Sequence, residues 1–170
     1  MKNGMQIGLW LAVSVFAFSQ EVQGLPDLKM PESGLEFREI EGYDSYHIVA
    51  THFRKDKNEL RYILANDIAF EAIKAEKIPL PNGSKIVKIG WSVKEMARFP
   101  DALEADNIQR VEYMIRTEQS PQESDGWGYA RFIKKDGEYT PYTGDIQSCV
   151  ACHALMHDHD ALFTRYQKHY

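Results

Sequence analysis

Hydrophobic and polar positions alternate in several segments of the chain and recur at helical spacing in one. The segment 46–53 (YHIVATHF) is rich in β-branched and aromatic residues, which predicts a strand. From residue 56 to about residue 77 the apolar spacing predicts a long helix, with a start signal at Asp56 and Glu59 and an end before Pro79. The apolar side of this helix would comprise Leu60, Ile63, Leu64, Ile68, Ala72 and Ile73.

Alternation returns in the second half of the chain. The segments 84–91 (SKIVKIGW), 110–117 (RVEYMIRT) and 127–133 (WGYARFI) predict strands, and Asp136-Gly137 is typical of a hairpin turn. Residues 94–108 lack a clear period and are expected to be irregular or weakly helical. Together these segments predict an α+β fold, with a mainly antiparallel β-sheet, one long helix and a short C-terminal helix that carries the cysteine motif.

The first nineteen residues have the pattern of an export signal. Lys2 precedes the apolar run 7–18, and the small residues Ala17 and Ser19 suit cleavage before Gln20. The run is shorter than the roughly 20 apolar residues that cross a bilayer, so we expect a signal peptide over 1–19 and no membrane span. This signal predicts a periplasmic or secreted protein.

The remaining chain is expected to hold a single domain. Residues 20–41 begin with a stretch that is rich in Pro and Gly and are predicted to be a leader arm, and residues 42–170 are predicted to be the domain. The formal net charge of −5 argues against a nucleic-acid partner, because phosphate binding needs a basic surface.

The strongest chemical signal is the segment CVACH, residues 149–153, which contains both cysteines of the chain. In an exported protein this CxxCH motif attaches a c-type haem: Cys149 and Cys152 would bond to the porphyrin, and His153 would reach the iron. A disulfide, a redox-active CxxC pair and a zinc site are the alternatives. Redox motifs belong to a βαβ pattern that this chain lacks, and zinc would need histidines as its remaining ligands. We therefore predict one covalently bound haem c.

The opposite face of the iron decides between electron transfer, gas binding and catalysis. The candidates for a sixth ligand that are distant in sequence are Met96, Met114, His47 and His52. No methionine stands in a Gly- or Pro-flanked loop near the C-terminus, where small electron-carrying cytochromes place theirs. The sequence therefore favours an open sixth position.

An ordered set of segments resembles the cytochrome P-460 family, which also contains cytochrome c′-beta. The segments are ELRYILANDIAFEAIKAEK, PNG, KIVKIGW, GWGYARF, CVACH and ALFTRY. The resemblance extends over about residues 42–168. It implies a largely β fold, usually a homodimer, with a five-coordinate c-type haem in a pocket.

The resemblance also implies roles for individual residues. Cytochromes P-460 carry a bond between the porphyrin and a lysine five residues after a turn glycine, and Lys88 follows Gly83 by five residues. The alternative is that Lys88 is an edge-strand or interface lysine. Glu112 lies near the family's pocket carboxylate, which would accept protons from the substrate, although a solvent-facing glutamate is the alternative. Arg61 matches a family arginine near the pocket or a haem propionate, and Arg131 is a second propionate candidate.

These implications leave two principal functions. The first is an enzyme that oxidises hydroxylamine or a related small nitrogen compound and passes electrons to a partner cytochrome. The second is a non-catalytic protein that binds nitric oxide or another gas, for which an apolar aromatic pocket wall would argue. A six-coordinate electron carrier is a third interpretation.

Overall fold

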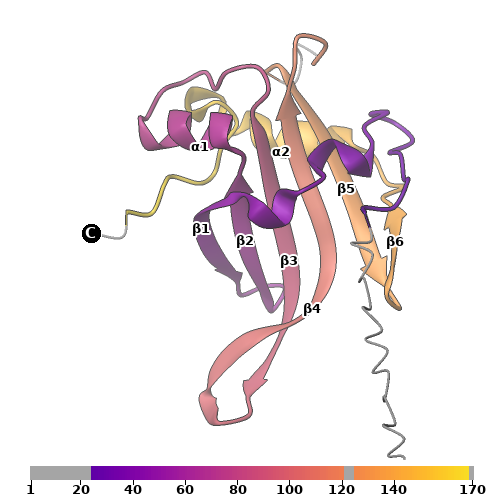
Figure 1. Ribbon diagram of the computed structural model, residues 1–170, viewed down its shortest axis with the longest axis vertical. Helices are drawn as coiled ribbons and strands as arrows, with labels where there is room; N and C mark the ends of the chain where they lie inside the picture. Colours follow the sequence, from indigo (N-terminus) through magenta and orange to yellow (C-terminus); the bar gives the residue numbers. More distant parts are fainter. Residues whose placement is uncertain (1–23, 121–124, 169–170) are drawn as a thin grey trace, which may run out of the picture.

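Six strands form one antiparallel sheet, in which each strand pairs with the next along the chain (Figure 1). The computed structural model describes residues 24–120 and 125–168, so the predicted signal peptide, residues 1–19, lies outside the described residues. The fold class, α+β with a mainly antiparallel sheet, is confirmed. The strands are β1 (His47–Arg54), β2 (Glu59–Ala65), β3 (Lys85–Met96), β4 (Phe99–Arg116), β5 (Trp127–Lys135) and β6 (Glu138–Pro141). The helices are α1 (Asp67–Lys74) and α2 (Gln147–Ala154), with short 3-10 helices at Phe37–Ile40, Tyr43–Ser45 and His157–His159.

The long helix predicted over residues 56–77 is wrong in its first half. Residues 59–65 form β2, which pairs with β1 on one edge and with β3 on the other. The helix α1 begins only after Asn66, whose side chain accepts a hydrogen bond from the Ala69 N–H at 3.2 Å. Asp56 lies in the turn before β2 and pairs with Arg54. A short apolar run is compatible with a helix and with a strand. Here the strand forms because the backbone of β2 pairs with a neighbouring strand on both of its edges.

The prediction of irregular structure over residues 94–108 is also wrong. These residues belong to the ends of β3 and β4, which form a hairpin that projects from one end of the sheet (Figure 1). The pairing of β2 with β3 stops at Ser92, and the pairing of β5 with β4 starts at Arg110. Beyond these points the hairpin has no neighbouring strand, and none of its residues 93–108 is buried. Without a buried face, its sequence shows no clean alternation of apolar and polar residues.

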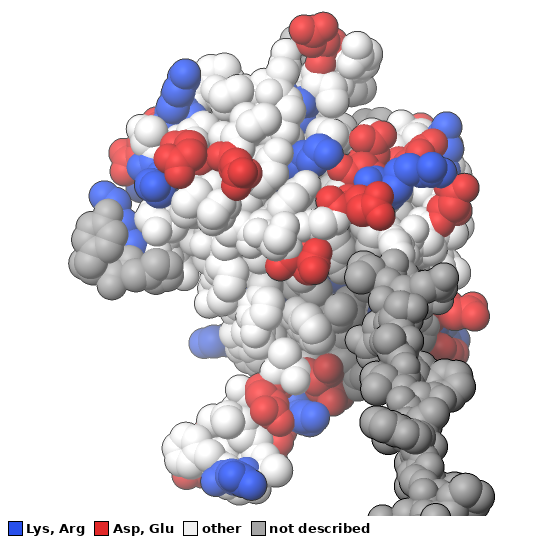
Figure 2. Space-filling view, in the orientation of Figure 1, with Lys and Arg blue, Asp and Glu red and all other residues white. Residues whose placement is uncertain are grey.

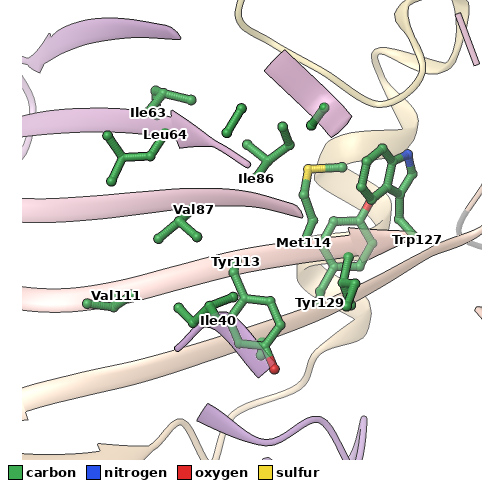
Figure 3. Packing of buried hydrophobic residues seen from close by; sticks show 14 of the residues in the cluster. Ile40, Ile63, Leu64, Ile86, Val87, Val111, Tyr113, Met114, Trp127 and Tyr129 are labelled. Carbon is green, nitrogen blue, oxygen red and sulfur yellow. The ribbon is translucent and has the colours of Figure 1, made fainter. Parts of the chain in front are cut away.

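One face of the sheet is covered by the segment 24–45, which crosses it before β1 begins (Figure 1). The Phe37 ring stacks on Phe132 of β5 with 4.3 Å between ring centroids. The Tyr113 hydroxyl of β4 donates to the Glu36 carbonyl oxygen at 2.6 Å. The packing of segment 24–45 on this face forms the main apolar core, part of which Figure 3 shows. Its buried members include Met30, Phe37, Ile40, Val87, Val111, Tyr113, Ala130 and Phe132.

The other face of the sheet carries the alternate residues of the same strands. On that side lie α2 and the C-terminal segment 160–168, which the hydrogen bond from the Gln167 N–H to the Val49 carbonyl oxygen, 3.1 Å long, ties to β1. Within the described ranges, no helix is both long enough and apolar enough to cross a membrane. The space between this face and α2 is the candidate site.

Candidate haem site

A cavity of about 730 Å³ lies between the sheet and α2. Its volume falls within the range of roughly 300–1,000 Å³ that is usual for small-molecule and cofactor sites. One wall is the face of the sheet opposite the apolar core, and the other is α2 with residues 162–164. The seven residues predicted from the sequence all line this one cavity: Arg61, Lys88, Glu112, Arg131, Cys149, Cys152 and His153.

Helix α2 presents the two thiols to the cavity. Cys149 and Cys152 are three residues apart, so they lie on the same side of the helix, and they form no disulfide. Burial raises the pKa of the Cys149 thiol, although the nearby Arg131 guanidinium opposes this effect. Among the residues that the structure describes, no group of three or more His, Cys, Asp or Glu side chains is placed to hold a metal ion. The disulfide and zinc alternatives therefore receive no support from the geometry.

The imidazole of His153 is held by a backbone carbonyl. Its Nδ1 lies 2.7 Å from the Ala161 carbonyl oxygen, which can only accept, so Nδ1 donates the proton and Nε2 keeps its lone pair. Burial lowers the pKa of His153, which favours the neutral ring. Histidines that bind metals commonly donate their second ring nitrogen to a fixed acceptor in this way. The ring also contacts Tyr129 and Phe163.

The Ala161 carbonyl is itself fixed by an unusual turn. Asp160 and Ala161 are consecutive residues with positive φ values, 55° and 61°. Residues other than glycine seldom adopt this left-handed conformation. The buried Asp160 carboxylate pairs with Arg116 and accepts the Leu80 N–H at 2.7 Å. The indole N–H of Trp127 donates to the Asp160 carbonyl oxygen at 3.1 Å. These contacts stabilise a backbone conformation that would otherwise be costly.

The register of the sheet places three charged residues in a row across neighbouring strands. Lys88 of β3 pairs with Glu112 of β4, and Glu112 pairs with Arg131 of β5. The carboxylate of Glu112 contacts the Lys88 Nζ at 2.6 Å and the Arg131 Nε at 2.5 Å. Burial opposes ionisation of Glu112, but the positive charges of Lys88 and Arg131 outweigh it and lower the pKa of Glu112 to about 2. The carboxylate is therefore ionised at neutral pH.

The structure excludes the solvent-facing alternative for Glu112 and the edge-strand alternative for Lys88. Glu112 is only 8% exposed, so the solvent-facing alternative is wrong. Lys88 stands on β3, between β2 and β4, so it is not an edge-strand lysine. Both side chains line the cavity.

A second cluster of charges, which the sequence analysis missed, adjoins the row. The Glu59 carboxylate, fully buried, contacts the Arg61 Nε and an Arg110 guanidinium nitrogen, each at 2.5 Å. Gly90 makes room for it, because a Cβ there would lie 3.0 Å from a Glu59 carboxylate oxygen. The sequence signal is the spacing of Glu59 with Arg61 and of Arg110 with Glu112, each two residues apart on one strand face. The expectation that Glu59 caps a helix concealed it.

The candidates for a sixth iron ligand separate in space. His52 and Met114 line the cavity, but His47 lies away from it, paired with Asp67 at 2.8 Å and stacked on Phe70. Met96 lies at the end of the projecting hairpin. Only two of the four candidates therefore remain near the site.

The residues of the cavity fit a haem. Two thiols on one side of α2 and an imidazole with its Nε2 lone pair available are the donors that a c-type haem requires. Arg61, Lys88, Arg110 and Arg131 supply positive charge that can pair with propionates, and Val49, Ile63 and Ile86 supply apolar surface for the porphyrin.

Comparison with known proteins agrees with this geometry. The sequence model of the family described as Cytochrome P460 matches residues 40–164. A search of curated proteins finds no match. The family match covers most of the chain, including both cavity walls and the CxxCH motif. The protein therefore belongs to the cytochrome P460 family, and it is a haem-binding cytochrome.

Proposed function

We propose that this protein is an exported cytochrome, periplasmic or secreted, that oxidises hydroxylamine or a related small nitrogen compound. It carries one haem c bonded to Cys149 and Cys152, with His153 as the only protein ligand of the iron. The observation that carries this proposal is the ionised Glu112, buried between Lys88 and Arg131 in the cavity that His153 lines. A charged wall suits a polar substrate that loses protons as it is oxidised.

The side chains of the cavity have distinct tasks in this reaction. When bound, the haem supplies the one-electron redox centre. The Glu112 carboxylate accepts hydrogen bonds from the N–H and O–H groups of the substrate, which orients the substrate in the cavity. Glu59 holds Arg61 and Arg110 in place beside the row, so that the positive charge of the wall has a defined position.

A carboxylate with a pKa of about 2 is a weak base, so proton uptake by Glu112 requires that its surroundings change. The Lys88 Nζ lies 2.6 Å from Glu112. A bond between Lys88 and the porphyrin would remove the ammonium charge from this contact and raise the pKa of Glu112. The bond that the resemblance implies would therefore also make the adjacent carboxylate a better proton acceptor.

Gas binding is the second candidate function. The aliphatic side chains Val49, Ile63 and Ile86 form an apolar part of the cavity, which suits a neutral diatomic ligand such as nitric oxide. The third interpretation, a six-coordinate electron carrier, would use His52 or Met114 as the additional ligand.

The proposal includes a homodimer and a partner cytochrome that accepts the electrons. The hairpin of β3 and β4 supports the dimer, since it exposes Phe99 and Leu103 and has no neighbouring strand at its end. Figure 2 shows uncharged surface on this hairpin between side chains of both signs. Such a mixed surface suits contact with a second copy of the chain.

The decisive experiment uses the holoprotein with Lys88→Leu and, as a matched control, Lys85→Leu. Lys85 lies on the same strand but on the opposite face, where its ammonium contacts the Glu39 carbonyl oxygen. We expect Lys88→Leu to change the ferrous absorption spectrum and to abolish hydroxylamine oxidation, whereas Lys85→Leu leaves both unchanged.

Peptide mapping of the wild type provides the second measurement. We expect a haem peptide that joins the Lys88 segment to residues 149–153. If Lys88→Leu leaves both the spectrum and the turnover unaltered, the enzyme proposal fails. Nitric oxide binding by that variant would then support the second candidate.

A further inference from the structure

We propose that a basic groove between α1 and the C-terminal segment docks an acidic electron-accepting protein, with Phe163 linking His153 to this surface. The inference rests on the proposed function, because oxidation of the substrate leaves electrons on the haem that a partner must remove.

The groove is a second cavity, of about 410 Å³, that adjoins the haem cavity. It lies between the end of α1, residues 76–80 and the C-terminal segment. Ile73 and residues 162–164 line both cavities. A single layer of side chains therefore separates the haem site from this part of the surface.

Phe163 is the member of this layer whose ring contacts His153. Its ring meets the His153 ring edge to face, with 5.3 Å between the centroids, and Phe163 also lines the groove. A partner seated on Phe163 would be close to His153, the proposed iron ligand. This closeness matters because electron transfer weakens steeply with distance.

The charge of the groove identifies the class of partner. Its lining includes Lys74, Lys77, Arg165 and Lys168, against Glu76 as its one carboxylate, and Lys74 also pairs with Glu71 at 3.2 Å. The groove therefore keeps a positive excess, to which Lys77, Arg165 and Lys168 contribute most. The whole chain, in contrast, has a net charge of −5. The molecule as a whole repels an acidic protein, whereas this patch attracts it. The acidic partner is therefore oriented so that its redox centre faces the groove.

The transfer balances as a simple exchange of one electron. The iron is oxidised from iron(II) to iron(III), and a one-electron centre in the partner, a haem or a copper ion, is reduced. No bond forms or breaks, and no proton is needed. Substrate turnover is not part of this step, so the step can be measured without hydroxylamine.

The first test measures oxidation of the dithionite-reduced holoprotein by hexacyanoferrate(III), a small anion, at low ionic strength. We expect the double variant Lys77→Glu/Lys168→Glu to lower the second-order rate constant by about tenfold or more. The cationic oxidant tris(phenanthroline)cobalt(III) should show the opposite change, and high salt should remove both differences. The haem reduction potential should stay the same.

The matched control is Lys134→Glu/Lys135→Glu, at the far end of β5, which changes the net charge equally. We expect its rate constant with hexacyanoferrate(III) to stay within a factor of about two of the wild type. An equal loss in both double variants would overturn the proposal, because it would show an effect of net charge alone. No loss in the groove variant would overturn it as well, since electrons would then leave elsewhere.

The second test maps binding and does not depend on electron flow. Plastocyanin, an acidic copper protein, is joined to the holoprotein with a carbodiimide, which links lysines to carboxylates in contact. We expect the cross-linked peptides to contain Lys74, Lys77 or Lys168. Cross-links that map instead to Lys134 or Lys135 would place the docking surface elsewhere and contradict the inference. Failure of hydroxylamine oxidation would leave both tests intact, so the two proposals can fail separately.

Discussion

The two faces of the sheet are built from alternate residues of the same strands, yet they differ in almost every physical property. Toward the N-terminal segment, β3 to β5 present Val87, Val111 and Phe132, all fully buried and apolar. Toward α2, the same strands present Lys88, Glu112 and Arg131, joined by ion pairs. One residue along the strand separates the two chemistries.

This difference indicates that the strands serve folding and function separately. The apolar face gains stability from burial, which needs only shape and hydrophobicity. On the charged face, part of the gain from the ion pairs is offset by desolvation, and apolar residues of similar size would be about as stable there, so stability alone does not account for the charges. Substitutions on the two faces should therefore affect different measurements.

The double variant Cys149→Ser/Cys152→Ser should lose the covalent haem completely, because serine cannot form the thioether bonds. Denaturing gel electrophoresis with a haem-peroxidase stain should show no stained band, whereas the wild type and Phe132→Ala keep theirs. Retention of the stain in the serine variant would contradict the attachment at α2. All proteins must be expressed with the haem maturation machinery.

Phe132→Ala, on the apolar face, should lower the free energy of unfolding by about 3–5 kcal/mol. The substitution leaves a cavity beneath Phe37, whose ring stacks on Phe132. Lys135→Ala on the same strand is the control and should change stability by no more than about 0.5 kcal/mol. Urea unfolding measures both, and the ferrous spectrum of folded Phe132→Ala should match the wild type. An altered spectrum would show that the two faces are not separate.

Glu112→Gln, on the charged face, should lower stability in a way that depends on pH. In the folded protein without a Lys88–porphyrin bond, the pKa of Glu112 is about 2, below its ordinary value of 4.5. The ionised carboxylate therefore contributes stability above pH 4.5, and this contribution disappears as the pH falls toward 2. We expect the variant to be less stable by about 2–3 kcal/mol at pH 6 and close to the wild type near pH 2. A difference that is the same at both pH values would contradict the ion-pair account.

His52→Ala should have the smallest effect. If the iron has an open sixth position, the ferric protein is mainly high-spin in electron paramagnetic resonance, and the variant keeps that signal. Met114→Ala, at the other cavity candidate, should behave in the same way. A low-spin wild type that becomes high-spin on either substitution would support the six-coordinate electron carrier.

Local pattern was sufficient for some parts of the molecule and insufficient for others, for identifiable reasons. The strands that contain Lys88 and Glu112 alternate over their paired length, so their existence could be predicted, as could the placement of these side chains on the face opposite Val87 and Val111. Whether that face lines a cavity or meets solvent could not be predicted, because it depends on what packs against the sheet. The strand that begins at Glu59 could not, because its short apolar run also matches a helix and its pairing with β1 and β3 depends on distant residues.

The cluster around Glu59 was hidden for the same reason. Its contacts with Arg61 and Arg110 exist only once the register of β2, β3 and β4 is known. The packing of Phe37 on Phe132 was equally inaccessible, since the segment that contains Phe37 has no period of its own. The cysteine motif, in contrast, is local and could be read directly.

The paired left-handed residues Asp160 and Ala161 have a consequence for the order in which the protein matures. Their conformation depends on contacts with Arg116 of β4, Trp127 of β5 and Leu80, all far away in the sequence. The carbonyl that orients His153 is therefore available only after the sheet has assembled. In the proposed holoprotein, attachment of the porphyrin to the thiols would need only the local motif, whereas a correctly aimed imidazole needs the whole fold. Attachment would then precede the finished iron site, and completion of the sheet would be the step that makes the cofactor functional.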